Sequence, residues 1–266
     1  MEKNKQARKE HKRRNAAVYI ILRVLVVACL VSQLFRENWH GAFLCLVALA
    51  LFTLPAILQK SFKIALPGTL EVIILFFILS GTVLGEIYNF YGHFPNFDTV
   101  LHTVNGFLCA GVGFALVDLL NKNSKELKLS PLYMAVAAFC FSMTVGAVWE
   151  FFERGMDSLF QMDMQKDRIV TTVSTVLLDP LNSNTPVVIS GIAETVMYDA
   201  EGNALAVVEG GYLDVGIYDT MKDLFVNFIG AVVFSVFGYF YVKNREKYTF
   251  TTRFIPKKIT EENEDN

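Results

Sequence analysis

Long apolar stretches alternate with short polar connections along most of the chain. Each stretch is close to the length of about 20 residues that a helix needs to cross the hydrocarbon core of a bilayer. The pattern therefore predicts an all-α membrane protein, folded as a six-span transmembrane helix bundle. The predicted spans are residues 16–35, 39–58, 65–91, 98–121, 132–155 and 219–243.

Basic residues are concentrated in alternate connections, which predicts an orientation. Lysine and arginine are frequent in residues 1–15, 59–63 and 121–130 and after Tyr241. Short basic loops face the cytoplasm, so we expect both termini there and the chain in a plasma membrane. The first apolar run is too long for a signal-peptide core and is expected to be retained. The predicted parts are a basic cytoplasmic N-terminus (1–15), a membrane domain (16–243) and a cytoplasmic tail (244–266) whose last residues, 261–266, are disordered.

One connection, residues 156–218, is long and is expected outside the cytoplasm as an insertion. Two β-rich runs, 187–198 and 204–209, flank the turn residues 199–203, which predicts a small extracytoplasmic β-hairpin over 187–209. A lone hairpin is marginally stable in water, so it is expected to pack on the bundle or on itself. It is either an ordered surface excursion or a lid or partner-binding element.

Composition agrees with a membrane location and excludes some functions. Hydrophobic residues make up 53% of the 266 residues, and the formal net charge is −2, which gives no basis for binding nucleic acid. All four cysteines lie inside apolar runs without metal-ligand spacing, so they are interpreted as small hydrophobic residues.

Acidic residues gather at the predicted outer ends of four spans. Glu150, Glu153 and Asp157 follow one another at i, i+3 and i+7, on one face of the fifth span. Acids at that depth and at a helix C-terminus are costly and tend to mark function. Two i, i+4 pairs, Asp98 with His102 and Asp219 with Asp223, begin the fourth and sixth spans, and Glu86 ends the third.

The topology brings these acids to one leaflet, with His102 and Arg154 as the only bases identified among them. We expect one polar site there, and carboxylates with one imidazole suit Mg, Mn, Ca, Fe or Zn as a divalent cofactor. Helix capping, by Asn96 or Asp98 and by a capping box over 220–223, is an alternative for some residues. Solvation in interfacial water is an alternative for Glu86, Glu150 and Glu153. The predicted ligands are Asp98, His102, Glu150, Glu153, Asp219 and Asp223, with Glu86 and Asp157 at the margin.

A second, sparser polar layer lies toward the cytoplasmic side. It contains Arg23, Glu71 and Asp118, each on a different span. Arg23 either extends its head group to the interface or forms an interhelical ion pair with Glu71 or Asp118.

Three motifs in order resemble a known family. They are residues 96–102 with Gly106, residues 149–153 with Asp157, and residues 219–224 with Gly230 and Ala231. The chain resembles the YjdF-like bacterial inner-membrane proteins over residues 65–243. The resemblance implies a compact multi-span bundle in a bacterial plasma membrane and no established activity. The segment between Asp157 and Asp219 departs from the family pattern as an insertion.

Three functions are compatible with these observations. The first is a metal-dependent membrane enzyme that acts on a lipid or lipid-linked substrate. The second is a cation or proton transporter that uses the same acids. Two observations argue against a transporter. The sequence has no matching acidic cluster on the cytoplasmic half, and no pair of spans is interrupted by Gly or Pro. The third is a structural or assembly protein. The sequence indicates neither an oligomeric state nor a specific substrate.

Overall fold

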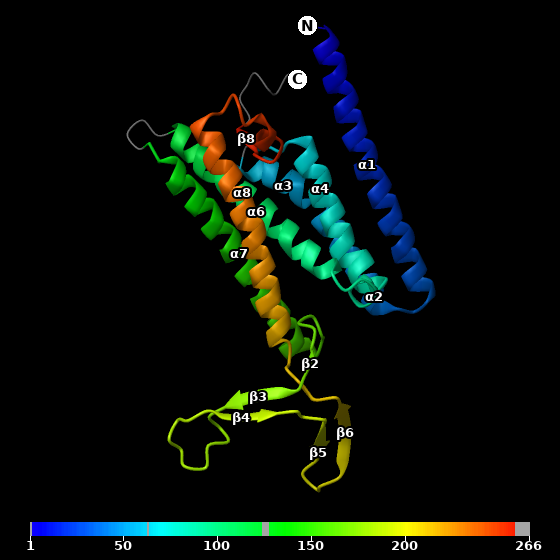
Figure 1. Ribbon diagram of the computed structural model, residues 1–266. Helices are drawn as coiled ribbons and strands as arrows, with labels where there is room; N and C mark the ends of the chain where they lie inside the picture. Colours follow the sequence, from blue (N-terminus) through cyan, green and yellow to red (C-terminus); the bar gives the residue numbers. More distant parts are fainter. Residues whose placement is uncertain (1, 63, 124–127, 259–266) are drawn as a thin grey trace. The chain divides into compact units, whose positions relative to one another are not determined.

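The computed structural model describes residues 2–62, 64–123 and 128–258 (Figure 1). The predicted disordered tail, residues 261–266, lies outside these described residues. Contacts divide the chain into two compact units. We call residues 1–146 with 225–266 the bundle unit and residues 147–224 the strand unit.

Six helical segments among the described residues are long and apolar enough to cross a membrane, as the apolar pattern predicts. They are residues 16–35, 39–61, 68–87, 97–122, 131–160 and 217–243. Their limits differ from the predicted ones by only a few residues. The helices that supply them are α1 (Glu2–Phe35), α2 (Trp39–Leu51), α3 (Leu54–Phe62), α4 (Gly68–Leu79), η1 (Ser80–Ile87), α6 (Phe97–Asn123), α7 (Pro131–Phe160) and α8 (Ile217–Lys243).

Two of the spans are not continuous α-helices. The second span breaks between α2 and α3 at Phe52 and Thr53. The third changes from α-helix to π-helix at Ser80, so that Glu86 lies within π-helical turns. The short helix α5 (Phe90–His93) then leads to α6, and Asn89 begins it in a left-handed conformation. π-Helical turns are rare and frequently occur at functional sites.

The bundle unit has two apolar cores. The first is formed by α1, α2, α4 and η1, which lie together in Figure 1, around residues such as Val26, Cys45 and Leu75. The second is formed by α6, α7 and α8 around Phe114, Met134 and Phe234. Burial of the cysteine Cys45 in this way agrees with its interpretation as a small hydrophobic residue.

Helices α6 and α8 approach each other closely at two glycines. A Cβ atom on Gly106 would lie 2.1 Å from the backbone oxygen of Asn227, and one on Gly230 would lie 2.0 Å from that of Thr103. Small residues at such crossings allow two membrane helices to bring their backbones into contact. Ser142 of α7 donates a hydrogen bond to the Gly106 carbonyl at 2.8 Å, so the same point also joins the third helix.

The C-terminal segment, residues 244–258, folds back onto the bundle unit instead of leaving it. The 3-10 helix η2 (Thr249–Arg253) contacts α4, and strand β8 (Lys257–Lys258) pairs antiparallel with β1 (Ile64–Ala65). Thr251 and Ile255 are buried. Part of the predicted tail is therefore an ordered component of this unit.

The polar layer in the bundle unit also differs from the expectation. Asp118 pairs with Arg245 of the C-terminal segment and with Lys122, not with Arg23. The Arg23 guanidinium lies over the Tyr19 ring, 4.3 Å from its centroid. Among the described residues no carboxylate forms an ion pair with Arg23. The predicted interhelical pair of Arg23 with Glu71 or Asp118 is therefore wrong.

The strand unit contains the predicted hairpin, with a second strand pair beside it in sequence. Strand β5 (Glu194–Tyr198) pairs with β6 (Ala204–Glu209) around residues 199–203, which confirms the turn. The first predicted run, residues 187–198, however, contains two strands, β4 (Val187–Ser190) and β5. Strand β4 does not join the hairpin but pairs with β3 (Thr172–Thr175). A third pair, β2 (Ile169–Val170) with β7 (Tyr212–Leu213), joins the beginning and end of the excursion.

Candidate functional site

In the bundle unit, the first turns of α6 carry an acid and an imidazole side by side. Nε2 of His102 lies 3.4 Å from Oδ1 of Asp98, at i, i+4 spacing, and the two side chains are 13% and 23% exposed. A carboxylate in this position fixes the orientation of an imidazole ring and its tautomer, as it does for many metal-binding histidines. The pair predicted from the spacing is confirmed.

The polar face of α6 continues one turn deeper. Asn105 donates a hydrogen bond from Nδ2 to Oδ1 of Asn227 at 3.2 Å, and Asn227 is only 1% exposed. The Nδ2 group of Asn227 lies 3.6 Å from the sulfur of Met143, and the Cys109 thiol lies 3.4 Å from Oδ1 of Asn105. A hydrogen-bonded polar group thus lies in the interior of the bundle unit, about one turn beyond His102 along α6.

In the strand unit, the end of α7 carries two buried acids. Glu150 is 5% and Glu153 8% exposed. The Trp149 indole donates a hydrogen bond from Nε1 to Oε1 of Glu153 at 2.7 Å. The alternative that both acids are solvated in interfacial water is therefore wrong, because protein atoms cover them.

The first turns of α8 carry two further buried acids with a lysine between them. Asp219 and Asp223 are 6% and 2% exposed. Nζ of Lys222 lies 3.6 Å from Asp219 and 3.5 Å from Asp223. The backbone N–H of Lys166 also donates to Oδ2 of Asp219, at 3.1 Å.

Lys222 is a base that the sequence analysis missed. Its i, i+3 spacing from Asp219 was a usable signal. Arg154, which was identified there, is exposed.

The predicted capping box over residues 220–223 is not formed. Helix α8 begins at Ile217, so Thr220 lies inside its first turn, and its hydroxyl accepts a hydrogen bond from Gln165 at 2.5 Å. Asp214 serves the helix start instead, because its carboxylate accepts from the backbone N–H groups of Gly216 and Tyr218.

The two residues expected at the margin have different settings. Asp157 accepts hydrogen bonds from the backbone N–H groups of Met164 and Gln165, at 2.6 and 2.9 Å, and so closes the turn that follows α7. This bonding gives Asp157 a structural role in the strand unit. Glu86 is half-buried in the last π-helical turn of η1, in the bundle unit.

Asp214 gives the strand unit a dependence on pH. Burial by itself raises the pKa of Asp214, but hydrogen bonds from the N–H groups of Arg168, Tyr218 and Gly216 outweigh it and hold that pKa below its usual value. A depressed pKa in the folded state contributes stability that is present above the unfolded value of about 3.9 and is lost as pH falls through the folded value.

We therefore expect Asp214→Asn to speed hydrogen exchange at the amides of Arg168 and Tyr218 at neutral pH. The wild-type protein should show the same change only in acid. Asp199→Asn is the matched control, because Asp199 accepts from Asn203 within the hairpin turn. It should speed exchange in that turn and leave Arg168 and Tyr218 unchanged. Equal exchange in Asp214→Asn and wild type would contradict the proposed role.

The predicted ligands are thus divided between the two units. Asp98 and His102 belong to the bundle unit, whereas Glu150, Glu153, Asp219 and Asp223 belong to the strand unit. Helices α7 and α8 each run through both units. The local pairings are described above, and convergence of all six residues on one site stays a prediction.

Comparison with known proteins identifies the family. No curated protein and no solved structure matches the chain. Residues 16–244, which include all six candidate spans, match the family described as predicted membrane protein DUF2238. This match agrees with the resemblance to YjdF-like proteins of unknown function that the three motifs indicated. The chain is a membrane protein that belongs to the DUF2238 family.

Proposed function

We propose that the acids of α6, α7 and α8 form one binding site for a divalent cation. The proposed ligands are drawn from six residues: Asp98, His102, Glu150, Glu153, Asp219 and Asp223. The helices run antiparallel in the proposed topology, so the beginnings of α6 and α8 and the end of α7 share one leaflet. Glu86 ends its span in that leaflet too and is assigned to the margin.

The burial of four carboxylates carries this proposal. Glu150, Glu153, Asp219 and Asp223 are each less than 9% exposed. An ionised carboxylate that is removed from water is costly unless a positive charge or a proton compensates it. Lys222 offsets one charge of the pair on α8. A divalent ion bound among these carboxylates would add two positive charges beside them.

The donor set fits such an ion. Carboxylate oxygens suit Mg²⁺, Ca²⁺ and Mn²⁺, and one imidazole extends the range to Fe²⁺ and Zn²⁺. Asp98, His102 and Asp223 together offer two carboxylates and one imidazole, and all three are shielded at least in part from solvent. The Asp98 carboxylate would hold the His102 ring, because their side chains already pair within α6.

The activity we propose is that of a metal-dependent enzyme on a lipid or lipid-linked substrate at the outer leaflet. A bound divalent ion would supply Lewis acidity, a more acidic water or a contact for a phosphate group. The chain itself would contribute Lys222 as a fixed positive charge and His102 as a group that holds or moves a proton at Nε2.

Metal analysis of the detergent-purified protein tests the cation site. We expect the wild type to retain a divalent ion through purification, and Glu153→Gln and Asp223→Asn to bind it roughly 10- to 100-fold more weakly while the protein still folds. Asp199→Asn, which also removes one carboxylate but in the exposed hairpin turn, should retain the ion. Equal retention by all four proteins, or no ion in any of them, would reject the site.

The membrane orientation is part of the proposal and has its own test. Both termini are proposed in the cytoplasm and residues 156–218 outside, because the short basic connections share one side. In a variant without native cysteines, a membrane-impermeant thiol reagent added to intact cells should label Asn203→Cys and not Glu246→Cys. The opposite labelling pattern would reverse the topology and place the acids in the inner leaflet.

A cation or proton transporter is the second candidate. The hydrogen-bonded polar group around Asn105 and Asn227 favours it, since polar side chains inside a bundle mark ion pathways. Purified protein in liposomes should then show ion or proton flux that Asn227→Leu abolishes. Absence of flux together with tight retention of metal would favour the enzyme.

A further inference from the structure

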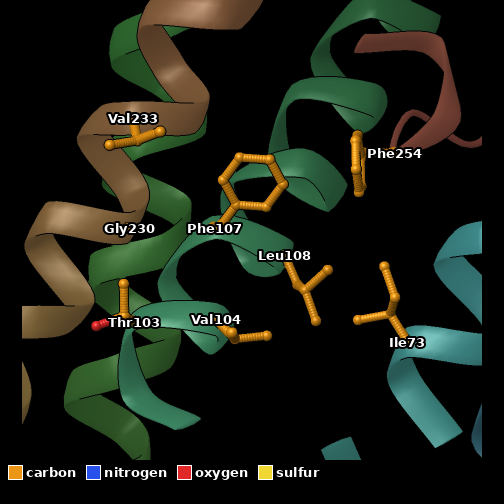
Figure 2. A pocket seen from close by; sticks show the side chains of 8 residues that line it. All are labelled: Ile73, Thr103, Val104, Phe107, Leu108, Gly230, Val233 and Phe254. Carbon is orange, nitrogen blue, oxygen red and sulfur yellow. The ribbon is translucent and has the colours of Figure 1, made fainter. Parts of the chain in front are cut away.

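A cavity of about 360 Å³ that opens to the surface lies among the helices of the bundle unit, and no acidic residue lines it (Figure 2). Four parts of the chain form its wall: α4, α6, α8 and the residue that follows η2. The eight lining residues are Ile73, Thr103, Val104, Phe107, Leu108, Gly230, Val233 and Phe254. Its volume falls within the range of about 300–1,000 Å³ that is typical of ligand pockets.

The wall offers almost no polar group to an occupant. Thr103 is the one lining residue with a polar side chain, and its hydroxyl donates to the backbone oxygen of Thr99 at 2.7 Å. An apolar space of this kind favours apolar molecules over water. The chemistry of the wall therefore selects a hydrocarbon.

The cavity is continuous with the surface that meets the bilayer. Every lining residue except Phe254 lies in a candidate membrane span. Val233 is 42% exposed, so one side of the wall borders the surrounding lipid. A hydrocarbon chain can thus enter the cavity laterally from the bilayer without crossing water.

The fourth part of the wall comes from the C-terminal segment. The Phe254 ring packs edge-on against Phe107, with ring centroids 5.1 Å apart at 89°. Gly111 on α6 leaves room for this segment, since a Cβ there would lie 3.2 Å from the Phe254 backbone oxygen. Thr251 and Ile255 of the same segment are buried. Phe254 is therefore part of the cavity wall (Figure 2).

We propose that this cavity binds one acyl chain of a membrane phospholipid. The acyl chain lies between α4, α6 and α8 and reaches Phe254. This binding site does not depend on the cation site, because it uses none of the acidic residues.

Photocrosslinking in a bilayer tests the proposal. Full-length protein is reconstituted into vesicles of phosphatidylethanolamine and phosphatidylglycerol, with a phosphatidylcholine that carries a diazirine within one acyl chain. After irradiation, mass spectrometry locates the adducts. We expect adducts on Val104, Leu108 and Phe254, in addition to those on lipid-facing residues. Adducts confined to the outward faces of the spans would overturn the proposal.

Two valine variants make the result specific. Val233→Trp fills the cavity, so adducts on Phe254 should fall about tenfold. Val31→Trp is the matched control, because Val31 is 45% exposed on α1 and lines no part of this cavity. It should leave the Phe254 adducts unchanged. Should both variants, or neither, reduce these adducts, the cavity is not the binding site. Elution of each variant as a single species on size exclusion confirms that it has folded.

Discussion

Replacing Gly106 by alanine should destabilise the bundle unit by about 3 kcal/mol. The added methyl group would lie 2.1 Å from the backbone oxygen of Asn227, and backbone cannot move aside as the end of a flexible side chain can. Helices α6 and α8 would have to separate. Their separation would strain the Asn105–Asn227 hydrogen bond and the Ser142 contact at the same crossing. Gly230→Ala should act in the same way, since its methyl group would lie 2.0 Å from the Thr103 oxygen.

Thermal unfolding in detergent, followed by the loss of the monodisperse protein, measures this effect. Gly155→Ala is the matched control: it makes the same substitution in α7, where nothing lies within 4 Å of the new methyl group. Alanine favours a helix over glycine by about 1 kcal/mol, so the control should unfold at the same or a higher temperature. If Gly106→Ala unfolds at the same temperature as Gly155→Ala, the close crossing of α6 and α8 is wrong.

Removing the charge of Arg245 should cost about 3 kcal/mol, because Lys122 is then the one remaining ion-pair partner of the buried Asp118 carboxylate among the described residues. Asp118 is 2% exposed, and both terminal nitrogens of Arg245 bond to it, at 2.6 and 3.3 Å. The ion pair connects α6 with the segment that follows α8. We therefore expect Arg245→Met to increase proteolysis of residues 244–258 as well as to lower the unfolding temperature.

A second substitution distinguishes a buried pair from a surface pair. Asp118→Leu in the Arg245→Met background should recover part of the lost stability, since the uncompensated charge is then absent. Lys122→Met should cost less than about 1 kcal/mol, because the lysine side chain is 54% exposed. An additive loss in the double variant would contradict the account.

Hydrophobic periodicity and length were sufficient for the membrane architecture. A span needs a long apolar run, and that requirement is local in sequence, so the predicted limits agree with the six helical segments. The turn between β5 and β6 was also predictable, because residues 199–203 favour a turn in their own right. The i, i+4 spacing of Asp98 and His102 gave their pairing for the same local reason.

Contacts between distant segments could not be predicted in this way. Arg245 reaches Asp118 across 127 positions, so no periodicity links them. A similar depth in the predicted spans was the one signal that suggested Arg23 as an alternative partner. Strand β3 has only four residues, mostly polar, and its sequence alone does not distinguish it from a loop. Its pairing with β4 makes it a strand. The folding of the C-terminal segment could not be predicted for the same reason, because its short elements gain stability from the helices that they contact.

The most direct test of the cation site is a nitrogen coupling from His102. Mn²⁺ is added to the purified protein, and electron spin echo envelope modulation then detects any imidazole bound to the ion. We predict a ¹⁴N modulation in the wild type. The modulation should persist in the control His93→Gln, because the His93 imidazole bonds to the Asn89 carbonyl and is not a proposed ligand. The modulation should disappear in His102→Gln. Absence of the modulation in the wild type, or its persistence in His102→Gln, would contradict the proposed site.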